Sequence, residues 1–154
     1  MTQINIIAIG KLQANDPEQQ LIGNYLKRLR WKTNLVSFES KIKDAAQSNK
    51  EENEFILSKL SSLPGFNIIL DEKGKHFTSL EFAKLISNSF NNHNHINFVI
   101  GGADGLTQAT KLRANEGICL GKLTWPHKLA RVMLAEQLYR SYSIIQNHPY
   151  HREG

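Results

Sequence analysis

Apolar positions along the chain fall into short continuous runs that are separated by longer amphipathic stretches. The runs have the length of strands and cover residues 4–9, 35–38, 66–70, 96–100 and 118–123. Strands that are apolar on both faces are typical of a parallel sheet covered on both sides, whereas half-solvated strands alternate apolar and polar residues. The pattern therefore predicts a mainly parallel sheet.

Helical periodicity fills the stretches between these runs. Apolar residues recur at helical spacing over residues 17–30, 51–63 and 78–90, and again after residue 126. Asp16 ahead of Pro17 is a favourable helix start, because aspartate caps free amides and proline fits the first helical position. The polar passage over residues 40–54 predicts an exposed loop that runs into a helix. Strands that alternate with helices predict an α/β fold with helices on both faces of the sheet.

Length and composition set the broad class of the protein. No linker long or polar enough to divide the chain is present, so a single domain over residues 1–154 is expected. The single cysteine, Cys119, excludes an internal disulfide and favours a reducing compartment. No apolar segment approaches the roughly 20 residues that a membrane helix needs, and no signal peptide is recognisable. A cytoplasmic protein without a membrane segment is expected.

The net charge of +5 is distributed unevenly. Residues 1–50 and 122–154 are basic, whereas residues 51–121 are mildly acidic. The densest basic run contains Lys27, Arg28, Arg30 and Lys32. Such a run is either the solvated end of a helix or a surface that grips a polyanion such as nucleic acid, and both interpretations stay open. No metal site is expected, because the histidines lack a convincing set of further ligands.

Three short connections that follow strand runs are candidates for a binding site. They cover residues 70–75, 101–105 and 121–126. Ligands of open α/β sheets collect beyond the carboxyl ends of the strands, so these connections are expected to lie at one end of the sheet. Asp71 and Gly74 also suit an ordinary turn. The glycines of the second connection match neither a dinucleotide fingerprint nor a phosphate loop, so each connection alone is weak support for a site.

The end of the chain is chemically richer than most chain ends. The apolar residues of the last helix cover an arc wide enough to need a partner besides the sheet, and a second copy of the chain is the simplest partner. Glu136 stands one turn before Arg140, which is typical of a surface ion pair. The tail over residues 147–153 then concentrates two imidazoles, a phenol, a guanidinium and a carboxylate. These groups accept, donate and carry charge near neutral pH, which favours a functional tail.

Three motifs in this order resemble those of one protein family. They are FVIGGADGL at residues 98–106, LTWPH at residues 123–127 and NHPYHRE at residues 147–153. Along essentially its full length the chain is similar to the RlmH family, which consists of bacterial methyltransferases of the SPOUT class. That family modifies N3 of a pseudouridine in the 23S ribosomal RNA of assembled ribosomes. Residues 37–62 carry no motif of the family.

The resemblance implies a trefoil knot near the carboxyl end, a homodimer, and S-adenosylmethionine bound by the knotted loops. It implies cofactor-binding roles for Leu70, Gly102, Gly121, Lys122, Leu123, Thr124, Trp125 and Pro126. It implies catalytic or substrate-side roles for His127, Arg140, Tyr150, His151 and Arg152. The active site is expected to lie at the dimer interface.

The implied reaction requires the N3 imide to lose a proton before it accepts a methyl group. Tyr150, His151 or His127 is expected to assist this loss, and Arg140 or Arg152 to balance the negative charge that develops on the ring. The competing interpretation is a basic module that docks on ribosomes without catalysis, since the net charge fits both. A hydrolase of a small phosphorylated metabolite is disfavoured, because no phosphate-binding motif is present.

Overall fold

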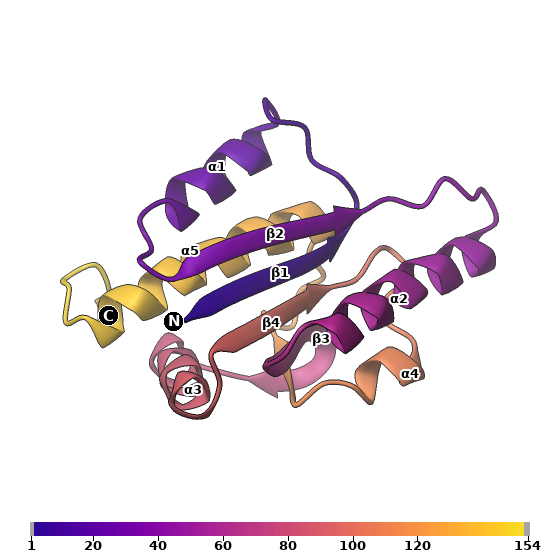
Figure 1. The fold of residues 1–154 in the computed structure, drawn as a ribbon. Helices are drawn as coiled ribbons and strands as arrows, with labels where there is room; N and C mark the ends of the chain where they lie inside the picture. The colour runs from indigo at the N-terminus through magenta and orange to yellow at the C-terminus, as the bar shows by residue number, and fades with distance from the viewer. Residues whose placement is uncertain (1, 153–154) are drawn as a thin grey trace.

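Strands and helices alternate along the chain in the computed structural model, which describes residues 2–152 (Figure 1). The strands are β1 (Gln3–Ile9), β2 (Lys32–Phe38), β3 (Phe66–His76), β4 (His95–Ile100) and β5 (Glu116–Cys119). The helices are α1 (Pro17–Leu26), α2 (Ala45–Ser62), α3 (Ser79–Asn92), α4 (Gln108–Lys111) and α5 (His127–Ile145). The predicted α/β class is confirmed.

The strands form one parallel sheet in the order β2-β1-β4-β3-β5. Because all strands point the same way, the carboxyl ends of β1, β4, β3 and β5 lie at one edge of the sheet. The connections that leave these strands therefore begin side by side, as the sequence predicted for the three candidate connections. This edge positions the site described below.

Two apolar clusters cover the two faces of the sheet, as the continuous apolar runs predicted. Successive side chains of a strand point to opposite faces, so β1 contributes Ile6 to one cluster and Ile7 to the other. The first cluster packs β1, β3 and β4 against Phe82 and Ile86 of α3 and against residues of α5. The second packs the opposite face against Ile56 and Leu60 of α2.

Helix α5 runs back along the sheet, opposite to the strand direction (Figure 1). Near its start, the fully buried Arg131 donates hydrogen bonds to the carbonyl oxygens of Ile9 (3.0 Å) and Gly10 (2.7 Å) at the carboxyl end of β1. Near its end, Tyr142 packs edge-on against Trp31, with ring centroids 5.1 Å apart. The chain therefore leaves α5 close to the turn between α1 and β2.

Two predicted strands differ from the observed ones. Strand β3 continues beyond residue 70 because Leu70 and Lys75 both pair with Ile118, and the residues between them bulge out of the ladder. Asp71 and Gly74 therefore form a bulge inside β3 and not a connection that ends the strand, and Asp71 Oδ1 accepts a hydrogen bond from the Lys73 N–H at 3.2 Å. Strand β5 ends at Cys119, whose thiol donates to the carbonyl oxygen of Gly121 at 2.9 Å. The strand predicted to reach residue 123 is therefore shorter.

The polar stretch before residue 51 also differs from expectation. Helix α2 begins at Ala45, because the side chain of Asp44 caps it by accepting a hydrogen bond from the backbone N–H of Gln47 at 2.9 Å. Periodicity alone placed the start later, since the first turns of α2 carry mainly polar side chains. Some of those polar residues contact the loop after β4.

A ladder of asparagines crosses the sheet near the amino ends of β1, β4 and β3. Asn5 and Asn97 are fully buried, and Asn5 Nδ2 donates to Asn97 Oδ1 at 2.7 Å. Asn97 Nδ2 in turn donates to Asn67 Oδ1 (2.9 Å) and to the Pro64 carbonyl oxygen (3.1 Å). Buried amides need such partners, because an unpaired polar group in the core costs more than a missing hydrogen bond.

The ladder predicts a stability loss that apolar burial alone would not produce. Asn97→Ala leaves the Asn5 amide and two acceptors without their partner, so the free energy of unfolding should fall by at least about 2 kcal/mol. Urea unfolding measures this change. Asn94→Ala, at an exposed position beside β4, serves as the control and should change it by less than about 0.5 kcal/mol. Equal losses in both variants would refute the role of the ladder.

Candidate active site

A cavity of about 420 Å³ lies beside the bulge of β3 and the carboxyl ends of β4 and β5. Its walls come from residues 70–73, 100–106, 118–121 and 123–125 and from the start of α5. These are the three connections that the sequence singled out, so the structure brings them together. The volume falls within the range of about 300 to 1000 Å³ that is typical of small-molecule sites.

Most of the predicted cofactor-binding residues line this cavity. They are Leu70, Gly102, Gly121, Leu123, Thr124 and Trp125. Lys122 and Pro126 belong to the same connection without lining the cavity. Leu123 and Trp125 are 72% and 40% exposed, so their apolar side chains lie at the mouth of the cavity, in contact with solvent.

The loop after β4 approaches its neighbours too closely for side chains. A Cβ atom on Gly101 would lie 2.9 Å from Leu106 Cδ2, and one on Gly102 would lie 2.9 Å from Glu52 Oε1. Gly105 has a φ of +76°, which favours glycine. Glu52, from α2, is held beside this loop, and burial raises its pKa above the usual value. The glycines therefore present backbone, not side chains, to the cavity.

His127, the first residue of α5, lies at the edge of the same cavity. Burial lowers its pKa, and the positive charges of Arg131 and Lys128 lower it further. The imidazole is therefore neutral at pH 7 and retains a nitrogen that can accept a proton. Of the five predicted catalytic residues, His127 is the one that shares a cavity with the predicted cofactor residues.

The tail folds back onto α5 instead of extending into solvent. Asn147 adopts a φ of +58°, which reverses the chain, and the backbone N–H of His148 donates to the Ser143 carbonyl oxygen at 2.7 Å. Tyr150 then packs edge-on against Tyr139, with ring centroids 4.7 Å apart. Glu153, the last residue of the tail motif, lies outside the described residues.

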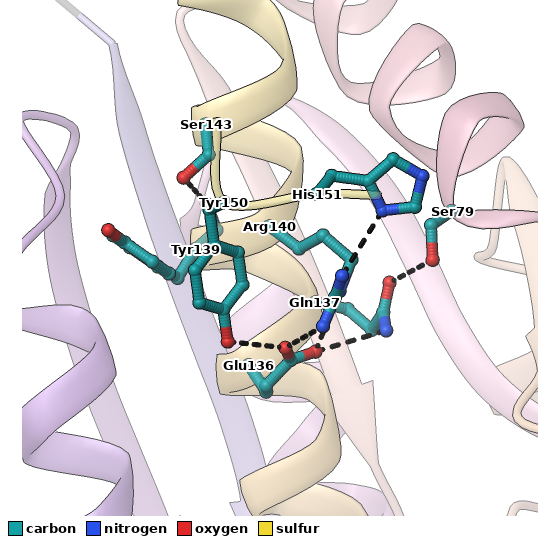
Figure 2. A network of polar contacts seen from close by, with 8 residues as sticks. All are labelled: Ser79, Glu136, Gln137, Tyr139, Arg140, Ser143, Tyr150 and His151. Carbon is teal, nitrogen blue, oxygen red and sulfur yellow. Dashed lines mark hydrogen bonds and ion pairs between the residues drawn. The ribbon is translucent and has the colours of Figure 1, made fainter. Parts of the chain in front are cut away.

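Glu136 is the centre of the contacts that hold the tail (Figure 2). The Tyr150 hydroxyl donates to Glu136 Oε2 at 2.8 Å, and Arg140 Nη2 donates to the same oxygen at 2.6 Å. Arg140 Nη1 also lies 3.1 Å from His151 Nδ1, and its guanidinium lies 4.9 Å from the centre of the Tyr150 ring. We call Glu136, Arg140, Tyr150 and His151 the tail cluster.

Three of the predicted catalytic residues thus come together around Glu136, to which the sequence assigned no functional role. Glu136 was expected to form an ordinary surface pair with Arg140, but the pair also holds the tail. No sequence signal marks this role, because it depends on the tail turning back across two helical turns. Arg152 is exposed and lies just beyond the cluster.

The environment of Tyr150 bears directly on its chemistry. Burial, followed by its hydrogen bond to the Glu136 carboxylate and the charge of that carboxylate, raises the pKa of Tyr150 to about 12. The phenol therefore keeps its proton at neutral pH and acts as a hydrogen-bond donor. Because the phenolate form is scarcely populated at neutral pH, Tyr150 is not available as the base.

The tail cluster and the cavity do not meet within one chain. Arg140, Tyr150, His151 and Arg152 are all outside the lining of the first cavity. Glu136 and Gln137 instead line a second cavity of about 470 Å³ between α1, α3 and α5. The two cavities share residues 118–121, so they lie on opposite sides of the same loop. Gln137 ties this face to α3 by accepting from the Ser79 hydroxyl at 2.9 Å.

The described residues contain neither a cluster of metal-binding side chains nor a helix suited to span a membrane. Within residues 2–152, no group of three or more histidine, cysteine, aspartate or glutamate side chains is arranged to hold a metal ion. Over the same residues, no helix combines the length and the apolar character required to cross a membrane.

The structure combines a parallel α/β sheet with a small-molecule cavity at its strand ends, and the connection into the last helix closes that cavity. This arrangement is typical of enzymes that bind a diffusible cofactor or substrate. A family model described as "Predicted SPOUT methyltransferase" matches residues 2–151. The chain belongs to this SPOUT methyltransferase family, and the resemblance inferred from the motifs is confirmed.

Individual relatives support the same assignment. Ribosomal RNA large subunit methyltransferase H of Rhizobium etli is 38% identical, over 97% of this chain and 99% of that protein. The protein of the same name from Zymomonas mobilis is 38% identical, over 99% of both chains. Among solved structures, a probable methylase family protein from Haemophilus influenzae has a TM-score of 0.63 at 14% identity, over 99% of this chain and 71% of that one. The last comparison supports the fold alone.

The tail cluster predicts an alkaline titration that burial and the Glu136 carboxylate set together. Glu136→Gln removes the negative charge beside the phenol, so the pKa of Tyr150 should fall below about 12, while burial keeps it above the ordinary value of 10. NMR of ring-labelled tyrosine follows this titration, with Tyr150→Phe assigning the signal. Between pH 10 and about 12 the unfolded chain releases the Tyr150 proton while the folded protein keeps it. The free energy of unfolding should therefore fall with rising pH over this range in the native protein, and less in Tyr150→Phe. A Tyr150 signal that titrates near 10 in the native protein would contradict this account.

Proposed function

We propose that the protein transfers a methyl group from S-adenosylmethionine to N3 of a pseudouridine in the 23S ribosomal RNA of the assembled ribosome. The observation that carries this proposal is the cavity at the strand ends, built by the connections that contain the family motifs. The relatives are named as methyltransferases of large subunit ribosomal RNA, which supports the class of substrate.

The cavity has the chemistry that this cofactor requires. Leu70, Ile100 and Ile118 supply apolar surface for a flat heterocycle, and the glycines of the loop after β4 allow backbone amides and carbonyls to approach it. Asp71, which forms an ion pair with Lys111 at 3.4 Å, and Asp104 also line the cavity, and the Asp104 carboxylate suits a cofactor that carries positive charge. Leu70, Gly102 and residues 121–126 are the proposed binding residues.

When bound, S-adenosylmethionine supplies a methyl group that is already activated by its sulfonium. The protein must therefore mainly align the accepting nitrogen and exclude water. The exposed Leu123 and Trp125 at the cavity mouth are placed to cover the site once the substrate is in position.

The chain must also remove the imide proton of the accepting base. His127 is neutral at pH 7 and lies at the cavity edge, so it is the preferred proton acceptor in this proposal. His151, with Nδ1 beside the Arg140 guanidinium, is the alternative. Tyr150 keeps its proton and donates a hydrogen bond, while Arg140 and Arg152 balance the negative charge on the ring.

A second copy of the chain is proposed to complete this site. In its own chain the tail cluster lies on the far side of the loop 118–121 from the cofactor cavity, so one chain does not unite the two groups. Helix α5 is largely covered by its own sheet, α1 and α3, yet Leu129 remains 43% exposed near Leu123 and Trp125. A homodimer would cover this apolar surface and bring a tail cluster to the partner's cavity.

The basic run beside the tail is proposed to contact RNA phosphates. Lys27, Arg28, Arg30 and Lys32 are all exposed in the turn after α1 and at the start of β2. The Arg28 guanidinium lies 5.4 Å from the centre of the Tyr139 ring, which packs on Tyr150. The positive surface is thus continuous with the tail cluster, where substrate is expected, and contributes affinity more than selectivity.

The proposed activity predicts transfer of labelled methyl to ribosomes from a strain that lacks the modification. Mapping should place the label on one pseudouridine of the large subunit RNA. Single changes at His127, Arg140, Tyr150, His151 and Arg152 should lower the rate, and activity within about threefold of native for all five would refute their roles. Ribosome binding without any calorimetric signal for S-adenosylmethionine would instead support the docking module.

The composite site predicts complementation between two inactive chains. Gly102→Val clashes with Glu52 and Ile9 and should displace the loop that forms one wall of the cavity, whereas a chain that ends at Gln146 lacks the tail. Each homodimer should be inactive. A heterodimer isolated with two affinity tags should have about half of the native activity, because it retains one intact cavity facing one intact tail. If each chain used its own tail, the heterodimer would be inactive as well.

A further inference from the structure

Helix α2 carries no family motif, but it holds the loop that forms one wall of the cofactor cavity. The loop over residues 100–106 leaves β4 and ends at Thr107, the N-cap of α4. Three α2 residues, Asn49, Glu52 and Asn53, face this loop. Helix α2, for which the sequence indicated no function, therefore lies directly behind the proposed binding site.

Asn53 makes most of these contacts and is only 2% exposed. Its Oδ1 accepts hydrogen bonds from the Thr107 backbone N–H at 2.9 Å and from the Thr110 hydroxyl at 2.8 Å. Its Nδ2 donates to the Asn49 carbonyl oxygen at 2.9 Å and to the Gly105 carbonyl oxygen at 3.3 Å. One buried amide thus connects α2, the end of the loop and the first turn of α4.

Asn49 supports the same loop carbonyl from one turn earlier on α2. Its Nδ2 donates to the Gly105 carbonyl oxygen at 3.0 Å. Gly105 is the residue whose positive φ, +76°, turns the loop towards Thr107. Two amides therefore fix the carbonyl of the residue that sets the path of the loop. A third contact point is Gly102, whose missing side chain lets the loop pack against Glu52 Oε1.

We propose that Asn53, assisted by Asn49, is a positioning residue that holds the loop 101–105 in the shape required to bind S-adenosylmethionine. This inference rests on the proposed function, since it names the cofactor of that site. Asparagine suits the task because its amide both accepts from Thr107 and donates to Gly105. An apolar residue in the same place would leave the Thr107 N–H without its buried acceptor, and the Gly105 carbonyl would keep only the hydrogen bond from Asn49.

The test compares cofactor affinity, turnover and loop exchange in the full-length protein. Asn53→Ala should raise the calorimetric Kd for S-adenosylmethionine by at least about tenfold, equivalent to roughly 1.4 kcal/mol. Its methylation rate at saturating cofactor should stay within about threefold of native, because Asn53 does not touch the reacting atoms. In the cofactor-free protein, hydrogen exchange at the backbone amides of Gly105 and Thr107 should become faster.

Two further variants separate positioning from general stability. Asn49→Ala should raise the Kd less than Asn53→Ala, because Asn53 still donates to Gly105. Ile56→Val removes one buried methylene group from the same helix and no hydrogen bond to the loop, so it should lower stability while leaving the Kd within about twofold of native. If Asn53→Ala proves too unstable, Asn49→Ala and Ile56→Val at equal stability still provide the comparison.

The possible failures are distinguishable. A folded Asn53→Ala protein with the affinity of Ile56→Val would overturn the positioning role while leaving the proposed function intact. If the native protein binds no S-adenosylmethionine, the proposed function fails, and this cofactor role fails with it. Exchange at Gly105 and Thr107 then still decides whether Asn53 holds the loop, because that measurement needs no ligand.

Discussion

Parallel pairing of β3 with β4 and with β5 is the constraint from which the cavity follows. Because these strands point the same way, the chain leaves all of them at one edge, and the connections over residues 70–73, 100–106 and 118–125 meet there. The bulge in β3 adds to this arrangement, since it lets both Leu70 and Lys75 pair with Ile118 and pushes Asp71 and its neighbours out of the ladder. A ligand at this edge is therefore bound mainly by connections, with the sheet as a rigid support.

The support for these connections comes from buried polar groups as much as from the apolar clusters. Arg131 anchors the start of α5 to the last carbonyls of β1, which fixes His127 beside Gly10 at the cavity edge. Asn53 anchors the loop after β4 from the opposite face of the sheet. Both side chains are buried and form hydrogen bonds with backbone atoms of another segment. Each therefore fixes the position of a backbone segment that apolar packing alone would not fix.

The tail cluster places an imidazole, a phenol and a guanidinium beside α5. Glu136 holds Arg140 and Tyr150 in fixed positions, and the resulting phenol is a donor and not a base. The basic run after α1 reaches the same surface through Arg28 and Tyr139. The cavity is thus separate from the tail cluster and the basic run in one chain, and the proposed dimer is the arrangement that would unite them.

The sequence by itself determined the α/β class, the five strands and the connections that carry the site, because continuous apolar runs and helix caps are local patterns. Its motifs also determined the family. Only the tertiary structure decided that Glu136 holds the tail, that α2 starts at Ala45 and supports the glycine loop, and that the tail lies away from the cavity of its own chain. These features join residues distant in sequence, such as Asn53 with Thr107, and depend on the paths of turns that no local pattern encodes.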